Sequence, residues 1–227
     1  MRANWAPMFS WWVHDGIIRD FTWRKDALGS PAGKLSALLL YIAMTIKRAE
    51  ESGINSVKVT YNRLSEMTGI SRELVREGIS ILERLEMVSI EKSGRNNIYT
   101  LINKRESGGW CKIPAKAIIS EDGRFITPFK ELKLRKRVEL HAVKIFLYLA
   151  SVRDNHSEYS MASYETIRKA IGISDKDVTK ALTLLTIIGM LDRVSMDKGG
   201  GGKENQPNKY YLAGYKTFFR RGDAISG

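Results

Sequence analysis

The sequence predicts a mainly α-helical protein with small β-hairpins, built as two similar halves. Three observations predict this fold class. The stretch Tyr61–Glu91 recurs 103 positions later as Tyr164–Val194, without a gap. Each copy places apolar residues at helical spacing on both sides of a glycine. Each copy is then followed by two β-prone runs around a polar turn, which predicts a hairpin. An internal repeat of this kind indicates one structural unit that occurs twice.

Seven positions are identical between the two copies, and they include the residues that shape the turn. They are Tyr61/Tyr164, Gly69/Gly172, Ile70/Ile173, Ser71/Ser174, Val75/Val178, Leu82/Leu185 and Met87/Met190. Each glycine follows a short helix, where a left-handed residue is favourable. The serine two positions later can then cap a second helix. Each copy therefore predicts two helices joined by a tight turn.

The second helix of the first copy has one apolar and one polar face. Thr60 is the predicted cap of the helix before it. The inward positions of the second helix are Val75, Ile79, Leu82 and Leu85, with Gly78 at a close helix crossing. The outward positions are Arg72, Glu73, Arg76, Glu77 and Ser80. This amphipathic pattern leaves a charged face open to a partner.

The second copy repeats this pattern with different charges. Its second helix carries Val178, Ala181, Leu182 and Leu185 inward and Lys176, Thr179 and Lys180 outward. Ser174 and Asp177 have the spacing of a capping box. Asp175 and Asp177 suit the positive end of the helix dipole but repel phosphate. We therefore expect the second copy to bind DNA more weakly than the first, or to serve as an interaction module.

Strands and further helices complete each copy. Val88–Lys92 and Ile98–Leu101 form the first predicted hairpin, and Leu191–Met196 with Lys209–Leu212 form the second. Helices are predicted over residues 35–48 and 138–152, and short strands at Val57–Val59 and Tyr159–Met161. Two helices followed by a hairpin resemble the winged helix-turn-helix DNA-binding proteins, here as two domains in tandem. Proteins with this tandem plan act as transcriptional regulators or as plasmid or phage replication initiators.

The resemblance implies domains at residues 34–103 and 137–214, and an interface on each. A helix fits the major groove of DNA, its N-terminal side chains reach base edges, and the neighbouring helix and wing contact phosphates. Base reading is therefore expected from Ser71, Arg72, Arg76, Lys176, Thr179 and Lys180. Phosphate contacts are expected from Tyr61, Asn62, Arg63, Lys92, Arg95, Asn96, Tyr164, Arg168, Lys169, Lys198, Lys203 and Lys209.

Composition agrees with a polyanionic partner. The 227 residues carry a formal net charge of +12. Such a balance favours nucleic acid or an anionic surface. No apolar run approaches the roughly 18 residues that cross a bilayer, and no secretory signal is evident. The lone Cys111 allows no internal disulfide, which fits a reducing compartment.

Catalysis and cofactors are not expected. The three histidines, His14, His141 and His156, lie far apart and have no metal-ligand spacing. The segment Gly29–Lys34 resembles a phosphate loop but lacks one residue between its glycines, and Leu35 replaces the magnesium-binding Ser or Thr. We therefore predict a protein that is not an enzyme and that needs neither cofactor nor metal.

Three segments lie outside the two copies. Residues 1–33 contain four of the five tryptophans, either as a dimerisation surface or, as we favour, as a cover over the first core. Residues 104–136 form a basic linker that either follows the phosphate backbone or is simply solvated, although Trp110 and Ile118 suggest that part of it packs. Residues 215–227 form a basic tail that touches DNA or a partner, or is disordered.

The sequence thus favours a cytoplasmic, nucleoid-associated protein that binds double-stranded DNA by sequence, most simply a transcriptional regulator. A plasmid or phage replication initiator is the main alternative. A winged-helix scaffold of chromosome organisation is a weaker one, because a net charge of +12 disfavours it. A homodimer is possible, and the residues do not indicate a small-molecule effector.

Overall fold

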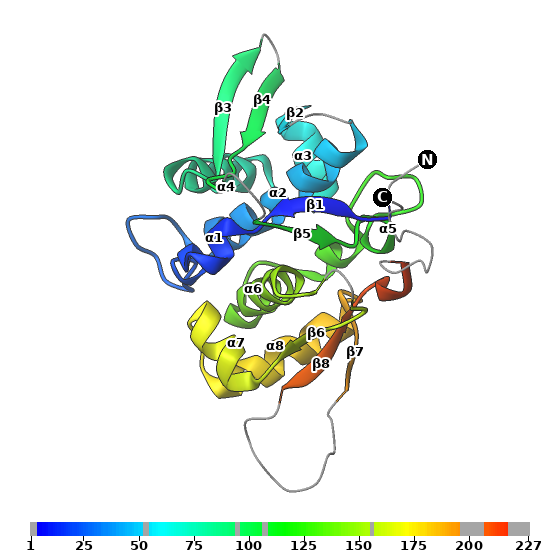
Figure 1. The fold of residues 1–227 in the computed structure, drawn as a ribbon. Helices are drawn as coiled ribbons and strands as arrows, with labels where there is room; N and C mark the ends of the chain where they lie inside the picture. The colour runs from blue at the N-terminus through cyan, green and yellow to red at the C-terminus, as the bar shows by residue number, and fades with distance from the viewer. Residues whose placement is uncertain are drawn as a thin grey trace, which may run out of the picture.

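The computed structural model describes residues 4–51, 55–93, 96–105, 109–154, 157–195 and 207–217. Helices form the larger part of the described chain and small antiparallel sheets the smaller part, as predicted. Two units of like topology lie on either side of a central layer (Figure 1). The central layer is built from the N-terminal segment and the segment that joins the units.

The first unit runs from a long helix to a hairpin. It contains α2 (Pro31–Glu50), β2 (Ser56–Val59), α3 (Tyr61–Thr68), α4 (Arg72–Arg84), β3 (Val88–Ser93) and β4 (Asn96–Leu101). Its three strands are antiparallel in the order β2-β4-β3. The hairpin register pairs Val88 with Leu101 and Ser93 with Asn96, and Gly94 and Arg95 lie outside the described residues.

The second unit repeats this order. It contains α6 (Arg137–Ser151), β6 (Ser160–Ala162), α7 (Tyr164–Ile171), α8 (Asp175–Ile187), β7 (Leu191–Ser195) and β8 (Asn208–Leu212). The sheet order β6-β8-β7 matches that of the first unit. Both helices of the repeated pair begin and end 103 positions after their counterparts. The offset read from the sequence is therefore also the structural offset.

The predicted turn chemistry is present in the first copy and changed in the second. Gly69 and Gly172 adopt φ of 72° and 69°, the left-handed conformation that glycine tolerates best. Ser71 caps α4 by accepting from the amide of Leu74 at 3.3 Å. Ser174 makes no such bond, and its hydroxyl instead donates to Asp177 at 2.7 Å. The predicted capping box is therefore wrong, because Asp177 is engaged elsewhere, as described below.

The N-terminal segment and the linker fold together into the central layer. They contain β1 (Ala6–Phe9), α1 (Trp11–His14), η1 (Ile17–Arg19), β5 (Trp110–Ile113), α5 (Ala115–Ile118) and η2 (Thr127–Glu131), and η3 (Tyr215–Thr217) follows the second unit. Strand β1 pairs antiparallel with β5. Trp11, Trp12 and Phe21 are fully buried. The N-terminal tryptophans are thus a cover over the core, and the linker is folded.

The two units pack on each other through their long helices. Helix α2 contacts α6, and the buried residues of both units belong to one continuous core. Trp12 meets Tyr41 of α2 edge to face, with ring centroids 5.4 Å apart. Lys144 of α6 is also buried here and donates to the carbonyl oxygen of Phe21 at 3.0 Å. Packing across this seam fixes the orientation of one unit relative to the other.

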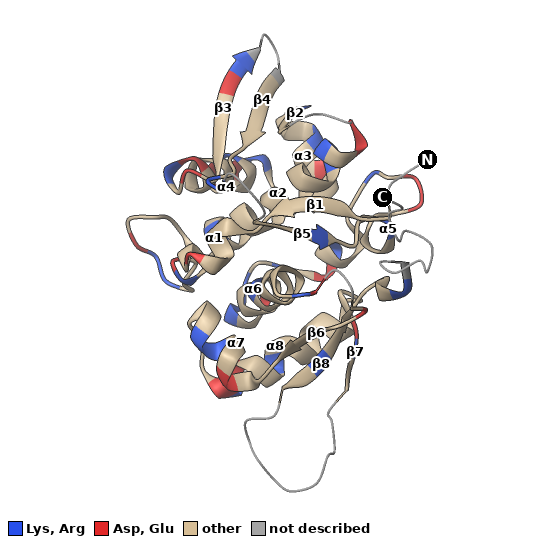
Figure 2. Ribbon diagram, in the orientation of Figure 1, with Lys and Arg blue, Asp and Glu red and all other residues tan. Residues whose placement is uncertain are grey.

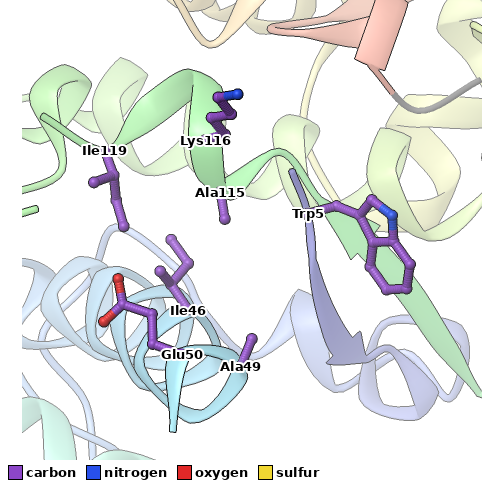
Figure 3. A pocket seen from close by; sticks show the side chains of 7 residues that line it. All are labelled: Trp5, Ile46, Ala49, Glu50, Ala115, Lys116 and Ile119. Atoms are coloured by element: carbon purple, nitrogen blue, oxygen red, sulfur yellow. The ribbon is translucent and has the colours of Figure 1, made fainter. Parts of the chain in front are cut away.

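A small cavity marks the contact between α2 and the linker. Figure 3 shows Ile46, Ala49 and Glu50 of α2 opposite α5, with Ile119 pointing toward them and Lys116 pointing away. Its volume of about 10 Å³ is room for one water molecule. This cavity is a packing gap and is too small for an organic ligand.

Gly78 lies where α4 crosses α2, as predicted. A Cβ atom there would stand 2.7 Å from Leu40 Cδ1 and 2.9 Å from the backbone nitrogen of Ala37. Because backbone cannot move aside cheaply, Gly78→Ala should lower the free energy of unfolding by about 1 to 3 kcal/mol. Urea denaturation measures the change. Ser80→Ala, on the exposed face of the same helix, is the matched control and should change it by less than about 0.5 kcal/mol.

Burial lowers the pKa of Lys144 from its usual 10.5 to about 7, with smaller effects of nearby Asp20, Arg19 and Lys34. Between these two values the unfolded chain binds a proton that the folded chain does not. The free energy of unfolding should therefore rise as the pH increases from 7 toward 10, and Lys144→Met should remove that part of the rise. Urea titrations at pH 7 and pH 9 test this. An equal rise in both proteins would contradict it.

Candidate nucleic-acid interface

The exposed face of α4 carries two arginines without protein partners. Val75, Ile79 and Leu82 are buried on the opposite face. Arg72 and Arg76 are exposed and make no hydrogen bond or ion pair with any described residue. Residues four apart in a helix project on the same side. The first turns of α4 thus present two free guanidinium groups together.

Glu77 does not share this exposed face, contrary to the sequence analysis. Its carboxylate accepts from the backbone nitrogen of Ser30 at 2.7 Å and from the Ser30 hydroxyl at 3.0 Å. Ser30 caps α2, so Glu77 lies at the positive end of that helix. Gly33 in the first turn leaves room for it, since a Cβ there would stand 2.3 Å from the Glu77 side chain. One negative charge is thereby turned away from Arg72 and Arg76.

A polar groove of about 270 Å³ adjoins Arg72. The residues that line it are Thr60, Tyr61, Asn62, Arg72 and Asn97. They come from the N-termini of α3 and α4 and from strand β4, three elements that the turn at Gly69 and the sheet bring together. Tyr61 and Asn62, both expected at phosphate, thus lie beside the base-reading candidate Arg72.

A side-chain hydrogen bond holds the hairpin side of the groove. The Asn97 amide donates to the Tyr99 hydroxyl at 3.0 Å, and burial raises the pKa of Tyr99 to about 12. Lys92 pairs with Asn97 in the strand register and is exposed. Glu91 and Lys92 are the charged residues of β3, and Figure 2 shows a basic segment beside an acidic one near the end of this strand. Arg95 and the side chain of Asn96 lie outside the described residues.

Arg63 is occupied within the protein. Its guanidinium donates to Glu66 at 2.6 Å, to the Arg124 carbonyl at 2.9 Å and to the Gly123 carbonyl at 2.7 Å. Arg124 also donates to Glu66 at 2.8 Å, and this bond together with that from Arg63 lowers the pKa of Glu66. Arg63 therefore fastens the 120–126 turn to α3, which does not support a phosphate contact.

The second pair of helices has fewer free cations than expected. Arg168 pairs with Asp175 at 3.2 Å, and Lys169 pairs with Glu165 at 2.5 Å. Asp177 is held by Arg137 at 3.0 Å. Lys176, Thr179 and Lys180 on α8 are exposed, and neither lysine has a partner among the described residues.

Not all of the residues expected to contact phosphate on the second hairpin and α7 lie within the described part of the chain. Lys209 lies over the ring of Tyr159, with its nitrogen 5.3 Å from the ring centroid. Tyr164 is half-buried at the start of α7. Lys198 and Lys203 lie outside the described residues. Of the lysines expected at phosphate on this hairpin, the described part of the chain contains Lys209, which packs on Tyr159.

Much of the basic charge in the linker is paired inside the protein. Lys104 pairs with Glu86, and Arg105 pairs with Asp15 at 2.8 Å. Arg135 and Lys136 are exposed and have no partner among the described residues. The sequence analysis assigned both residues to the linker. In the structure they directly precede Arg137, which contacts Asp177 of α8, 40 residues further along the chain.

Loss of Arg63 should harm the fold more than binding. Arg63→Ala removes charge-assisted bonds to two backbone carbonyls and should lower the free energy of unfolding by roughly 1.5 to 3 kcal/mol. Asn62→Ala, the exposed neighbour, should leave it nearly unchanged. Urea denaturation of both variants makes the comparison. Equal stability of Arg63→Ala and the unsubstituted protein would show that the turn does not need this clamp.

Neither a metal cluster nor a membrane-crossing helix is found in the part of the chain that the structure describes. No group of three or more His, Cys, Asp or Glu there could hold a metal ion, and no helix there is long and apolar enough to cross a membrane. Comparison with family models, curated proteins and solved structures found no match. The geometry around α4 is therefore the basis of the functional proposal.

Proposed function

We propose that the protein is a tandem winged helix-turn-helix protein that binds double-stranded DNA by sequence. The observation that carries this proposal is the pair of unpartnered arginines, Arg72 and Arg76, at the start of α4. They stand beside a polar groove, while the neighbouring acid Glu77 is bound to the end of another helix. In helix-turn-helix proteins the N-terminal residues of the second helix contact base edges, and Arg72 and Arg76 occupy that part of α4.

The chemistry of base reading fits these side chains. α4 enters the major groove with its first turns toward the bases, and we call α4 and α8 the reading helices. An arginine there can donate two parallel hydrogen bonds to O6 and N7 of guanine. The groove lined by Tyr61, Asn62 and Asn97 takes a backbone phosphate, and Lys92 contacts the next stretch of backbone.

Two reading helices in one chain suit a two-part site. Because α2 packs on α6, the separation of α4 and α8 does not vary freely. One chain then does what a dimer of single-domain proteins does at paired half-sites. The net charge of +12 adds attraction that does not depend on sequence. Regulation of transcription is the simplest role, and initiation of replication is the alternative.

Substitution of the two arginines tests the base-reading role. Arg72→Ala and Arg76→Ala should each weaken binding to the cognate duplex by ~1 to 3 kcal/mol and relax base preference at one position. Arg76→Lys keeps the positive charge but cannot donate two parallel hydrogen bonds. This variant should therefore bind random DNA as tightly as the unsubstituted protein and still lose the base preference at that position. Fluorescence anisotropy with cognate and scrambled duplexes measures both.

Substitution of Lys92, a proposed phosphate contact, is compared with substitution of the base-reading arginines. Lys92→Ala should weaken binding to cognate and scrambled duplexes alike and reduce the salt dependence by about one phosphate contact. The measurement is anisotropy at several salt concentrations. Absence of salt-sensitive affinity of the unsubstituted protein for any duplex would exclude DNA binding.

The arrangement of bound sites separates the two roles. Selection of bound fragments from random and source DNA would yield the preferred sequence. A single two-part site near a promoter indicates a regulator, whereas clustered direct repeats indicate an origin of replication.

A further inference from the structure

The positively charged residues of α8 do not align with those of α4. The aligned pairs are Arg72/Asp175, Glu73/Lys176, Arg76/Thr179 and Glu77/Lys180. The two cations of α8 therefore stand one residue further along than those of α4. One residue corresponds to about 100° around a helix. The basic flank of α8 consequently faces a different neighbour from the basic flank of α4.

The segment that reaches this side of α8 is the start of α6: Arg137, its first residue, contacts Asp177, and the loop of residues 133–136 precedes it. Glu139 of α6 is buried, and its carboxylate accepts from four consecutive backbone amides. The distances are 2.5 Å from Lys133, 3.2 Å from Leu134, 2.8 Å from Arg135 and 2.7 Å from Lys136. Leu134 adopts φ of 55° and packs against the core. The backbone of this loop is therefore fixed before any ligand arrives.

The side chains of the loop project outward from this fixed backbone. Arg135, Lys136 and Arg137 are all exposed. Arg137 reaches Asp177 in the first turn of α8 at 3.0 Å and neutralises it. Lys180 lies three residues after Asp177, so it projects from the adjoining part of the helix surface. The Arg137–Asp177 pair thus joins the end of the loop to the first turn of α8, next to the position of Lys180.

The cations of α7 are paired with Glu165 and Asp175. In the first unit, the groove beside Arg72 lies on the α3 side of the reading helix. At the start of the second unit, four exposed cations have no hydrogen bond or ion pair from their side chains to a described residue: Arg135 and Lys136 of the loop and Lys176 and Lys180 of α8. We call these four residues the second-unit ridge.

We infer that the second-unit ridge binds the phosphodiester backbone of duplex DNA, on the flank of the reading helix opposite to the one used by the first unit. This inference rests on the proposed function. The four cations have no partners to give up, and the fixed loop reduces the conformational entropy lost on binding. Each phosphate that they neutralise releases counterions. On this assignment Lys176 and Lys180 contact phosphates instead of the base edges expected from the sequence, which leaves Thr179 as the base-reading candidate of α8. The ridge therefore contributes affinity without reading sequence.

The test removes the two cations of the loop and compares the effect on DNA binding with that of removing two cations elsewhere in the protein. Arg135→Ala/Lys136→Ala is measured beside Arg24→Ala/Lys25→Ala, which removes two exposed cations from the loop before α2. Anisotropy of a labelled duplex is recorded from low to moderate salt. The ridge variant should lose roughly 1.8 units of the slope of log affinity against log salt, for two phosphates. It should keep the base preference of the unsubstituted protein.

Equal effects of the two double variants would mean that only net charge matters, and would overturn the inference about the ridge. An unchanged slope of log affinity against log salt in the ridge variant would also overturn it. Failure of the proposed function looks different, because the unsubstituted protein itself would then show no salt-dependent binding to any duplex. A loss of affinity confined to one sequence would also overturn the inference, since it would indicate base reading by the loop.

A second variant tests whether the order of the loop matters. Glu139→Gln raises the net charge by one, so charge alone would strengthen binding. An amide offers one oxygen and two donors, so it cannot accept from four amides as the carboxylate does. The variant should therefore bind the duplex several-fold more weakly despite its added charge, with circular dichroism confirming that it is folded. Binding as tight as that of the unsubstituted protein would show that the ordered loop is not required.

Discussion

The close crossing of α2 over α4 at Gly78 determines which face of α4 is left for a partner. A side chain at this position would meet the backbone of α2, so the two helices approach only because glycine is there. The same crossing brings Glu77 to the capped start of α2, where it satisfies Ser30. With the buried face and one acid fixed in this way, Arg72 and Arg76 are left pointing outward. The proposed interface follows from this packing.

The tertiary structure also decides which charged side chains form ion pairs. A net charge of +12 would repel itself if it were spread evenly, and many cations are paired with acids from distant segments. Among the described residues, the cations without such a partner include two on α4, two on α8 and two in the loop before α6. Binding is proposed for these residues because their charge is not used within the described part of the chain.

The two units use the same backbone plan with different electrostatics. Their helices begin and end at equivalent positions, yet Asp175 replaces Arg72 and Lys180 replaces Glu77. In the first unit Glu77 is bound at the start of α2, whereas in the second unit Asp177, which aligns with Leu74, is bound by Arg137, the first residue of α6. A duplicated fold has thus kept its packing and changed the flank that carries positive charge.

The sequence by itself determined the helices, the turns at Gly69 and Gly172, and the hairpins, because these depend on neighbours a few residues apart. Helical spacing, a cap and a glycine that tolerates positive φ are local signals. It did not determine which charges stay free. Glu77 and Ser30 are 47 residues apart, Arg63 and Gly123 are 60 apart, and Arg137 and Asp177 are 40 apart. Only the tertiary structure decides such pairings, since an ion pair forms wherever folding brings two charges together. For the same reason the apparent linker proved to be folded, with β5 paired to β1 of the N-terminal segment.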